Sequence, residues 1–257
     1  MSEEDVVLVE TADGVMTITL NRPKAKNAVN RALAVAVAAA IDELESNDQL
    51  RAAIITGAAN TFCSGMDLKA FVTGEMPVVE GRGFAGLCEY TCSKPLIAAV
   101  EGYALAGGTE ILQGTDIRVA AENAIFGVTE VARGLYPMSG STIRLRRQIP
   151  YCLAAEILLC GEHITAQQAL DFGLINKIVP PGETLAAARE YARKICANGP
   201  LAVRAVTRSL REHQECMPED EAMHASDELA GPVFASADAK EGMRAFKEKR
   251  PAKFTGN

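Results

Sequence analysis

The chain lacks several features that would indicate a particular class of function. Its 257 residues include no CxxC pair, only three histidines and no long basic block. No apolar run approaches the roughly 18 residues needed to span a bilayer. These absences argue against a general nucleic-acid binder, a membrane partner and a zinc site. The chain also has no GxxxxGK[ST] loop and no GxSxG elbow, so it lacks the signatures of P-loop enzymes and serine hydrolases.

The cysteines are odd in number and scattered. We interpret all seven as reduced thiols, mostly in the core, which indicates a cytoplasmic protein. The first ten residues, MSEEDVVLVE, have neither a basic region nor an apolar region of the secretory type, so we expect no signal peptide. The formal net charge of -7 further disfavours nucleic acid as a partner.

The first half of the chain alternates strand and helix patterns. VVLVE and GVMTITL flank Ala12-Asp13-Gly14, which predicts a hairpin. Helical spacing over residues 30–46, with Asn30 as N-cap, predicts an amphipathic helix. Buried strands are predicted at 52–57, 95–100 and 116–122, and helical segments near 80–92 and 107–113. The alternation predicts an α/β fold with a partly parallel sheet.

The second half is mainly helical. Residues 139–173 have the pattern of short helices, and LINKIV at 174–179 is one further strand. Residues 182–248 are expected to be helical, with breaks at Gly199-Pro200, near Pro218 and at Gly231-Pro232. The sequence therefore predicts a core that carries the active site over residues 1–195 and a helical region over 196–257.

Four short segments have the composition of functional loops. They are NRPKAKNAVN (21–30), TFCSGMDLKAF (61–71), ALAGGTEIL (104–112) and AIFGVTEVARGLYP (124–137). Loops that follow parallel strands gather at one end of a sheet, where ligands bind. Ser64-Gly65 and Gly107-Gly108 can each present a backbone N–H closely, because glycine has no Cβ. Two such N–H groups form a site for a carbonyl oxygen that gains negative charge.

Two carboxylates lie in these segments. Glu110 and Glu130 are suited to move protons, and in a dry cleft their pKa values should rise above about 4.3. Each feature also has an ordinary structural explanation, such as a tight turn, a first-turn glutamate or, for Asp67, an N-cap. A set such as Arg22, Lys24 and Lys26 is more often a solvated surface than a phosphate-binding site. We expect His163, His213 and His224 on helices away from the site and assign them no role.

In this order and spacing, the four segments resemble the enoyl-CoA hydratase/isomerase (crotonase) family. The resemblance continues through AAEILLCGEHITAQQALDFGLINKIV to AFKEKRPAKF and covers nearly the whole chain. It implies an α/β, crotonase-like spiral of ββα units with a C-terminal helical trimerisation region. It also implies a homotrimer or a hexamer made of two trimers, an acyl-CoA thioester substrate and no separate cofactor or metal.

The resemblance also implies roles for individual residues. The N–H groups of Ser64 and Gly107 would hold the thioester oxygen, and Glu110 and Glu130 would be the catalytic acids. Where many relatives have a glycine-rich run, this chain has LYPMSGSTIRL, so Tyr136 and Met138 would shape the acyl pocket. Further contacts to coenzyme A would come from Lys24, Ala25, Lys26, Ser64, Gly65, Met66, Asp67, Leu68 and Gly107, with Lys253 and Phe254 reaching the ligand of a neighbouring subunit.

The two glutamates favour one reaction within the family. Retention of both implies syn hydration of a trans-2-enoyl-CoA, of the fatty acid β-oxidation type. Three alternatives stay open: dehydration of a hydroxyacyl-CoA such as carnitinyl-CoA, isomerisation of a 3-enoyl-CoA, and a non-catalytic acyl-CoA-binding or RNA-associated relative. The sequence leaves the acyl group, the pathway, the direction of flux and the choice of trimer or hexamer undetermined.

Overall fold

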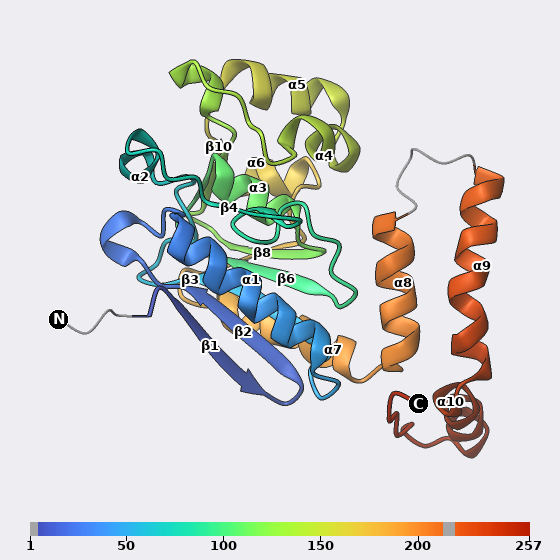
Figure 1. The fold of residues 1–257 in the computed structure, drawn as a ribbon. Coiled ribbons are helices and arrows are strands. Elements are labelled where there is room, and N and C mark those ends of the chain that lie inside the picture. The colour runs from blue at the N-terminus through green and yellow to red at the C-terminus, as the bar shows by residue number, and fades with distance from the viewer. Residues whose placement is uncertain (1–4, 213–218) are drawn as a thin grey trace.

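A six-stranded sheet forms the centre of the molecule (Figure 1). The computed structural model describes residues 5–212 and 219–257. β1 is antiparallel to β2 and the other neighbours are parallel, which confirms the predicted hairpin and the buried strands. In spatial order the strands are β1 (Val7–Ala12), β2 (Val15–Leu20), β3 (Ala52–Gly57), β6 (Leu96–Val100), β8 (Ile117–Ala121) and β11 (Lys177–Val179).

Two helices cover opposite faces of this sheet (Figure 1). Successive side chains of a strand point to opposite faces, and the two isoleucines of β3 show it. Ile55 packs in the core cluster that contains α1 (Arg31–Ser46), whereas Ile54 packs in the cluster with α7 (Thr184–Cys196). Both isoleucines are fully buried. The central sheet is therefore covered by apolar helix faces on both sides.

Both ends of α1 are capped by side chains. Asn30 Oδ1 accepts a hydrogen bond from Leu33 N at 3.1 Å, as the sequence predicts. At the other end, the buried Lys94 donates from Nζ to Leu44 O at 2.6 Å and to Asn47 O at 2.9 Å. A cation suits these carbonyls because the C-terminal end of a helix carries partial negative charge.

A smaller sheet builds the edge where the predicted loops meet. β7 (Tyr103–Leu105) runs parallel to β9 (Ile125–Gly127), and β10 (Ile164–Thr165) is antiparallel to β9. Single bridges join Cys63 to Ala104 and Val29 to Met66. α3 (Gly107–Gln113) follows β7, and the short η2 helix (Glu130–Arg133) follows β9. The four predicted loops therefore meet beside this sheet.

Several short helices surround this edge (Figure 1). The predicted short helices between 139 and 173 and the strand near 174–179 are confirmed, but the short strand β10 was not anticipated. The short helices are η1 (Pro23–Ala25), α2 (Leu68–Val72), α4 (Ser141–Gln148), α5 (Tyr151–Cys160) and α6 (Ala166–Asp171).

The predicted helix near 80–92 is wrong. The segment contains a hairpin of β4 (Val78–Val79) and β5 (Gly83–Phe84), followed by turns. Gly81, Gly83 and Gly86 all have positive φ, which a right-handed helix does not allow. These glycines have GxGxxG spacing, but dinucleotide binding needs that spacing between a strand and a helix. Here it forms a hairpin, so it indicates no nucleotide site.

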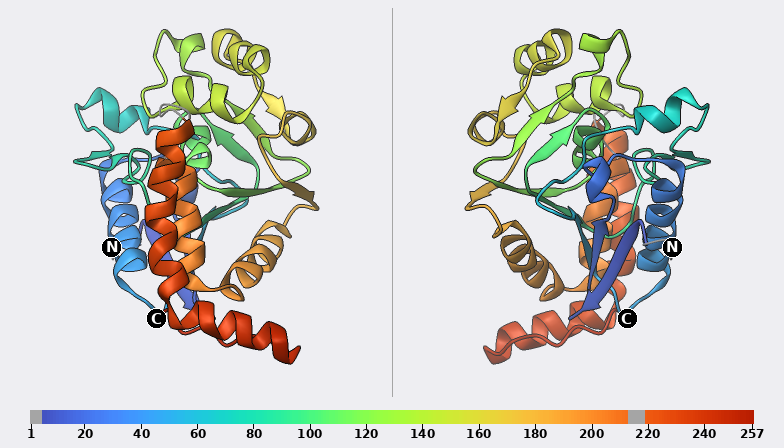
Figure 2. Two further views of the ribbon diagram at one scale, coloured as in Figure 1. Left: turned by 90° about the vertical axis from the view of Figure 1, so that its right-hand side faces the viewer. Right: turned by 90° about the vertical axis from the view of Figure 1, so that its left-hand side faces the viewer.

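The C-terminal part consists of α8 (Pro200–Glu212), α9 (Glu219–Ala235) and α10 (Ala237–Glu248). α8 and α9 form an antiparallel pair beside the α/β body, and α10 lies at their base (Figures 1 and 2). The break at Gly199-Pro200 is confirmed, and the one near Pro218 lies outside the described residues. The break at Gly231-Pro232 is wrong, because Pro232 lies inside α9. Pro232 removes the backbone N–H that would donate to Glu228 O, so α9 continues through it with one hydrogen bond fewer.

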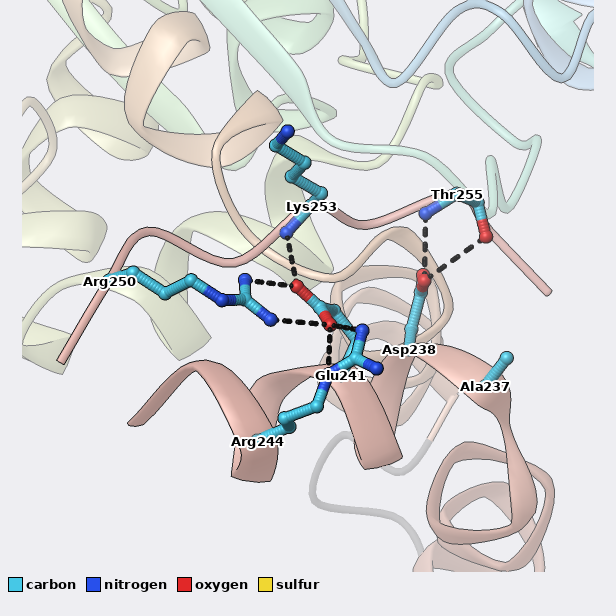
Figure 3. Close-up of a pocket in the computed structure, with 7 residues that line it drawn as sticks. All are labelled: Ala237, Asp238, Glu241, Arg244, Arg250, Lys253 and Thr255. Carbon is cyan, nitrogen blue, oxygen red and sulfur yellow. Dashed lines mark hydrogen bonds and ion pairs between the residues drawn. The ribbon is translucent and has the colours of Figure 1, made fainter. Parts of the chain in front are cut away.

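The C-terminal tail is held against α10 by two carboxylates (Figure 3). Glu241 accepts hydrogen bonds from Arg250 Nη1 at 2.6 Å and from Lys253 N at 3.0 Å. Asp238 accepts from Thr255 N at 2.7 Å. Backbone and side-chain donors therefore fix residues 250–256 in place.

Two further findings concern the described residues alone. No helix among them is long and apolar enough to cross a bilayer. The six cysteines in the described ranges are free thiols, as predicted, and Cys216 lies outside those ranges.

Candidate active site

A cleft of about 510 Å³ opens where the predicted loops meet. Its walls come from the first loop, the 64–78 segment, the hairpin at Phe84, the turns that begin α3 and η2, and the 135–139 segment. Of the predicted site residues, the structure brings these to the cleft: Lys26, Ser64, Met66, Leu68, Gly107, Glu110, Glu130, Tyr136 and Met138.

The two glycine turns contact each other. A Cβ placed on Gly65 would lie 3.0 Å from Leu105 O and 3.2 Å from Gly107 N. Gly65 has a φ of +96° and Ala106 a φ of +51°. The left-handed region is uncommon for a non-glycine residue and needs support from its surroundings. The predicted convergence of these turns is therefore present in the structure.

The first turn has one backbone N–H without an acceptor in the described chain, and it belongs to Met66 rather than Ser64. Buried N–H groups are nearly always paired, so an unpaired one beside a cleft is a candidate for ligand binding. Ser64 N donates to Lys26 O at 3.1 Å, which corrects the prediction that this N–H is available. The neighbouring donors are also used: Cys63 N by Tyr103 O, Gly65 N by Cys63 Sγ and Asp67 N by Val29 O.

The second turn leaves the N–H of Gly107 without an acceptor among the described residues. Leu105 N donates to Cys63 O, and Ala106 N donates to Gly127 O at 2.7 Å. Gly107 is the first residue of α3, so its N–H lies at the positive end of the helix dipole. Gly107 therefore fits the predicted role, and Met66 in the contacting turn has the other N–H without an acceptor among the described residues.

Glu110 is buried in the first turn of α3, with 2% of its surface exposed. Its Oε1 accepts hydrogen bonds from Ser139 N at 2.9 Å and from Ser141 N at 3.1 Å. Burial raises the pKa of this carboxyl, and the two N–H donors oppose the rise by stabilising the charged form. The pKa direction agrees with the sequence-based expectation.

Glu130 begins η2 and has a different environment. Its Oε2 is buried and has no hydrogen-bond partner among the described residues. Burial raises the pKa of Glu130 to about 7, with a further contribution from the charge of Glu110 and an opposing one from Arg133. A carboxyl with that pKa is partly protonated at neutral pH, which suits a general acid.

The cleft contains residues that the sequence did not reveal. Tyr136 and Met138 line it as predicted. Phe84 was missed because its segment was interpreted as helical. His163 also lines the cleft, which corrects its expected remote position, because β10 pairs with β9 and brings the preceding turn close. His213 lies outside the described residues, and so does the side chain of His224. The remaining apolar lining comes from Phe71, Met76, Pro77, Val78 and Leu135.

The basic loop contributes one cation to the cleft. Lys26 lines it, with Nζ 5.1 Å from the centre of the Tyr103 ring. Arg22 instead bonds Asp67 at 2.9 Å, and Asp67 caps α2 by accepting from Lys69 N and Ala70 N. The carboxylate of Asp67 therefore has a structural use. Three other predicted coenzyme A contacts are absent from the described cleft lining: Lys24, Ala25 and Gly65.

The tail residues lie apart from the cleft of their own chain. The ring of Phe254 packs beside Gly199 and Gly242, and Arg51 Nη2 donates to Phe254 O at 3.3 Å. Phe254 thus anchors the tail, and its contact with a neighbour's ligand stays a prediction. The side chain of Lys253 extends away from α10 (Figure 3), and its contact with a neighbouring subunit stays a prediction.

Comparison with known proteins gives a consistent result. The enoyl-CoA hydratase/isomerase family matches residues 10–257. The chain is 50% identical to the enoyl-CoA hydratase EchA19 of Mycobacterium tuberculosis, over 96% of this chain and 95% of that protein. It is 38% identical to a carnitinyl-CoA dehydratase of Salmonella arizonae, with 95% of each covered.

A solved structure agrees with these relatives. The crystal structure of the enoyl-CoA hydratase EchA1 from Mycobacterium marinum superposes with a TM-score of 0.96 at 49% identity, covering 99% of this chain and 100% of that one. The predicted crotonase fold is thereby confirmed. From its sequence, its fold and its relatives, the chain belongs to the enoyl-CoA hydratase/isomerase family.

Proposed function

We propose that the protein adds water across the 2,3 double bond of a trans-2-enoyl-CoA thioester. One observation carries this proposal: the buried Glu110 and the half-buried Glu130 line the same cleft as Met66 and Gly107, whose backbone N–H groups have no acceptor among the described residues. Paired carboxylates move protons, and paired N–H groups stabilise a developing oxyanion. The relatives named enoyl-CoA hydratase support the same reaction.

The oxyanion site activates the substrate. The thioester oxygen accepts hydrogen bonds from Met66 N–H and Gly107 N–H, and this polarises the conjugated system so that C3 becomes electrophilic. As water attacks, negative charge collects on that oxygen. Removing one donor of this kind typically raises the barrier by about 3–4 kcal/mol. The dipole of α3 adds to the stabilisation at Gly107.

The two glutamates take opposite roles. Two N–H donors favour the charged form of Glu110, so Glu110 accepts a proton from water as the C3–O bond forms. Among the described residues Glu130 has no such donor on Oε2, so its protonated form supplies the proton to C2. Both carboxyls act from one wall, which gives syn addition. Relay of the proton from Glu110 to Glu130 through water then resets the site.

The testing experiment is hydration of crotonyl-CoA by the purified protein. Glu110→Gln and Glu130→Gln should each lower kcat by about 10²–10⁴-fold, while coenzyme A thioesters still bind. Glu122→Gln, an exposed glutamate outside the cleft, is the matched control and should keep parental activity. Binding without turnover in the parent would overturn the hydratase proposal and leave a non-catalytic binder, or an isomerase if a 3-enoyl-CoA is converted.

A second candidate is dehydration of a hydroxyacyl-CoA that carries a cationic acyl group. Glu89 lines the cleft with an exposed carboxylate and has no cation partner among the described residues. A relative is named carnitinyl-CoA dehydratase. Glu89→Gln should then lower kcat/KM for a quaternary-ammonium substrate and leave crotonyl-CoA unaffected. Equal loss for both substrates, or for neither, would contradict this candidate.

A further inference from the structure

Arg144 is a half-buried arginine close to the start of α4, outside the cleft lining. Its Nη1 donates to Ser139 O at 3.2 Å, and its Nη2 donates to Cys88 O. A cation near the N-terminal end of a helix is disfavoured by the helix dipole. The two carbonyl partners account for its presence there.

The first of these partners belongs to the turn that holds Glu110. Ser139 donates its N–H to Glu110 Oε1 at 2.9 Å and offers its carbonyl to Arg144. Ser141 supplies the second N–H to the same oxygen, at 3.1 Å. Gly140 between them has a φ of +113°, and a Cβ there would lie 2.8 Å from Arg144 Nη1. The turn therefore packs directly against the guanidinium.

The second partner belongs to a different segment of the chain. Cys88 is fully buried in the segment that follows β5. Phe84 of that segment contacts the oxyanion turn, since a Cβ on Gly107 would lie 2.6 Å from its ring. Arg144 therefore connects the turn that donates to Glu110 with the segment that follows β5.

We propose that Arg144 is a positioning residue for the hydration reaction: by bridging Ser139 O and Cys88 O, it fixes the turn whose N–H groups orient the carboxylate of Glu110. This inference rests on the proposed function. Without the bridge, Glu110 keeps its place on α3, but its carboxylate is free to rotate away from the attacking water. Arg144 does not line the cleft, so we expect coenzyme A binding to persist without it.

The test compares Arg144→Met, Arg144→Lys and the control Arg146→Met, an exposed arginine on the same helix. Methionine keeps an unbranched apolar stem and removes the donors. For crotonyl-CoA hydration we expect kcat of Arg144→Met to fall by about 10- to 100-fold, the size expected for a displaced catalytic group. KM should change little, Arg144→Lys should recover part of the loss, and Arg146→Met should match the parent.

The pH profile separates positioning from a general loss of structure. Loss of the N–H donors raises the pKa of Glu110 further, so the acidic limb of kcat/KM moves to higher pH in Arg144→Met. The other ionisable groups near Glu110 are Glu130 on η2, Cys88 and Arg144 itself. If the shift of the acidic limb comes from Glu110, the double variant Arg144→Met/Glu130→Gln shows the same shift.

Amide hydrogen exchange of residues 138–148 gives a readout that needs no turnover. Protection should fall in Arg144→Met and stay unchanged in Arg146→Met. Unchanged exchange, kcat and pH profile in a folded Arg144→Met would overturn the inference. An inactive parent would contradict the proposed function instead, and the exchange data would still decide whether Arg144 holds the turn. If Arg144→Met does not fold, Arg144→Lys supplies the same comparison.

Discussion

The two glutamates of the cleft differ in what stabilises their carboxylates. Two N–H groups donate to Glu110 Oε1, whereas Glu130 Oε2 has no partner in the described chain. In the proposed mechanism, this difference in environment makes one of two chemically identical side chains the base and the other the acid. Burial raises both pKa values, and the N–H donors of Ser139 and Ser141 oppose the rise at Glu110.

This difference predicts a bell-shaped pH dependence of kcat/KM. The acid must be protonated, so activity should fall as pH rises through the pKa of Glu130, about 7. The base must be charged, so activity should also fall as pH decreases through the raised pKa of Glu110. The measurement is kcat/KM for crotonyl-CoA between about pH 5 and pH 9. An alkaline limb that persists in the residual activity of Glu130→Gln would contradict the assignment.

At the scale of the element, α1 depends on a cap that its own sequence does not contain. The buried Lys94, 50 residues from Leu44 in sequence, supplies the donors for the last carbonyls of the helix. The N-terminal cap at Asn30 is local and was predictable from the residues around it. A C-terminal cap brought from the start of β6 depends on tertiary structure instead.

Lys94→Met should therefore destabilise the protein without altering the cleft. Methionine retains most of the stem but leaves two carbonyls without a charged donor, which costs about 2 kcal/mol. For a chain of this size that corresponds to a fall in Tm of roughly 4–8 °C. Lys240→Met, an exposed lysine on α10, is the control in thermal denaturation. Equal Tm values for the two variants would show that the cap contributes no stability.

Local signals predicted the strands, the first helix and the glutamates, while non-local packing determined the rest. Periodicity and the Asp-Gly turn identified β1 to β3, because those patterns lie within one element. The helix expected near 80–92 failed because Gly81, Gly83 and Gly86 impose left-handed backbone that periodicity does not register. Phe84 was missed for that reason.

Whether Met66 or Ser64 has the available N–H depends on backbone hydrogen bonds between distant segments. The sequence located the right turn, since Gly65 contacts the Gly107 turn. Only the fold shows that Lys26 O accepts from Ser64 N. His163 entered the cleft for a similar reason, because the pairing of β10 with β9 joins segments far apart in sequence.

At the scale of the whole molecule, the C-terminal helices expose apolar side chains that a monomer leaves in water. Figures 1 and 2 show α8 and α9 as a pair that stands beside the α/β body. Exposed apolar groups in numbers usually mark an interface. The large exposed ones on these helices include Val206, Leu210, Phe234, Met243 and Phe246.

We expect the chain to self-associate through this region, as the trimerisation proposed for residues 196–257 requires. Closed symmetry buries one such surface repeatedly without leaving it exposed at an end. Light scattering after size exclusion should give the mass of three or six chains. Leu210→Glu combined with Phe234→Glu should shift the protein to lower mass, because two desolvated carboxylates oppose association. Lys240→Met serves as the neutral control. A parent that is monomeric at micromolar concentration would contradict this expectation and show that α8 to α10 have another use. The tail would then contribute only to its own chain, through the anchoring of Phe254.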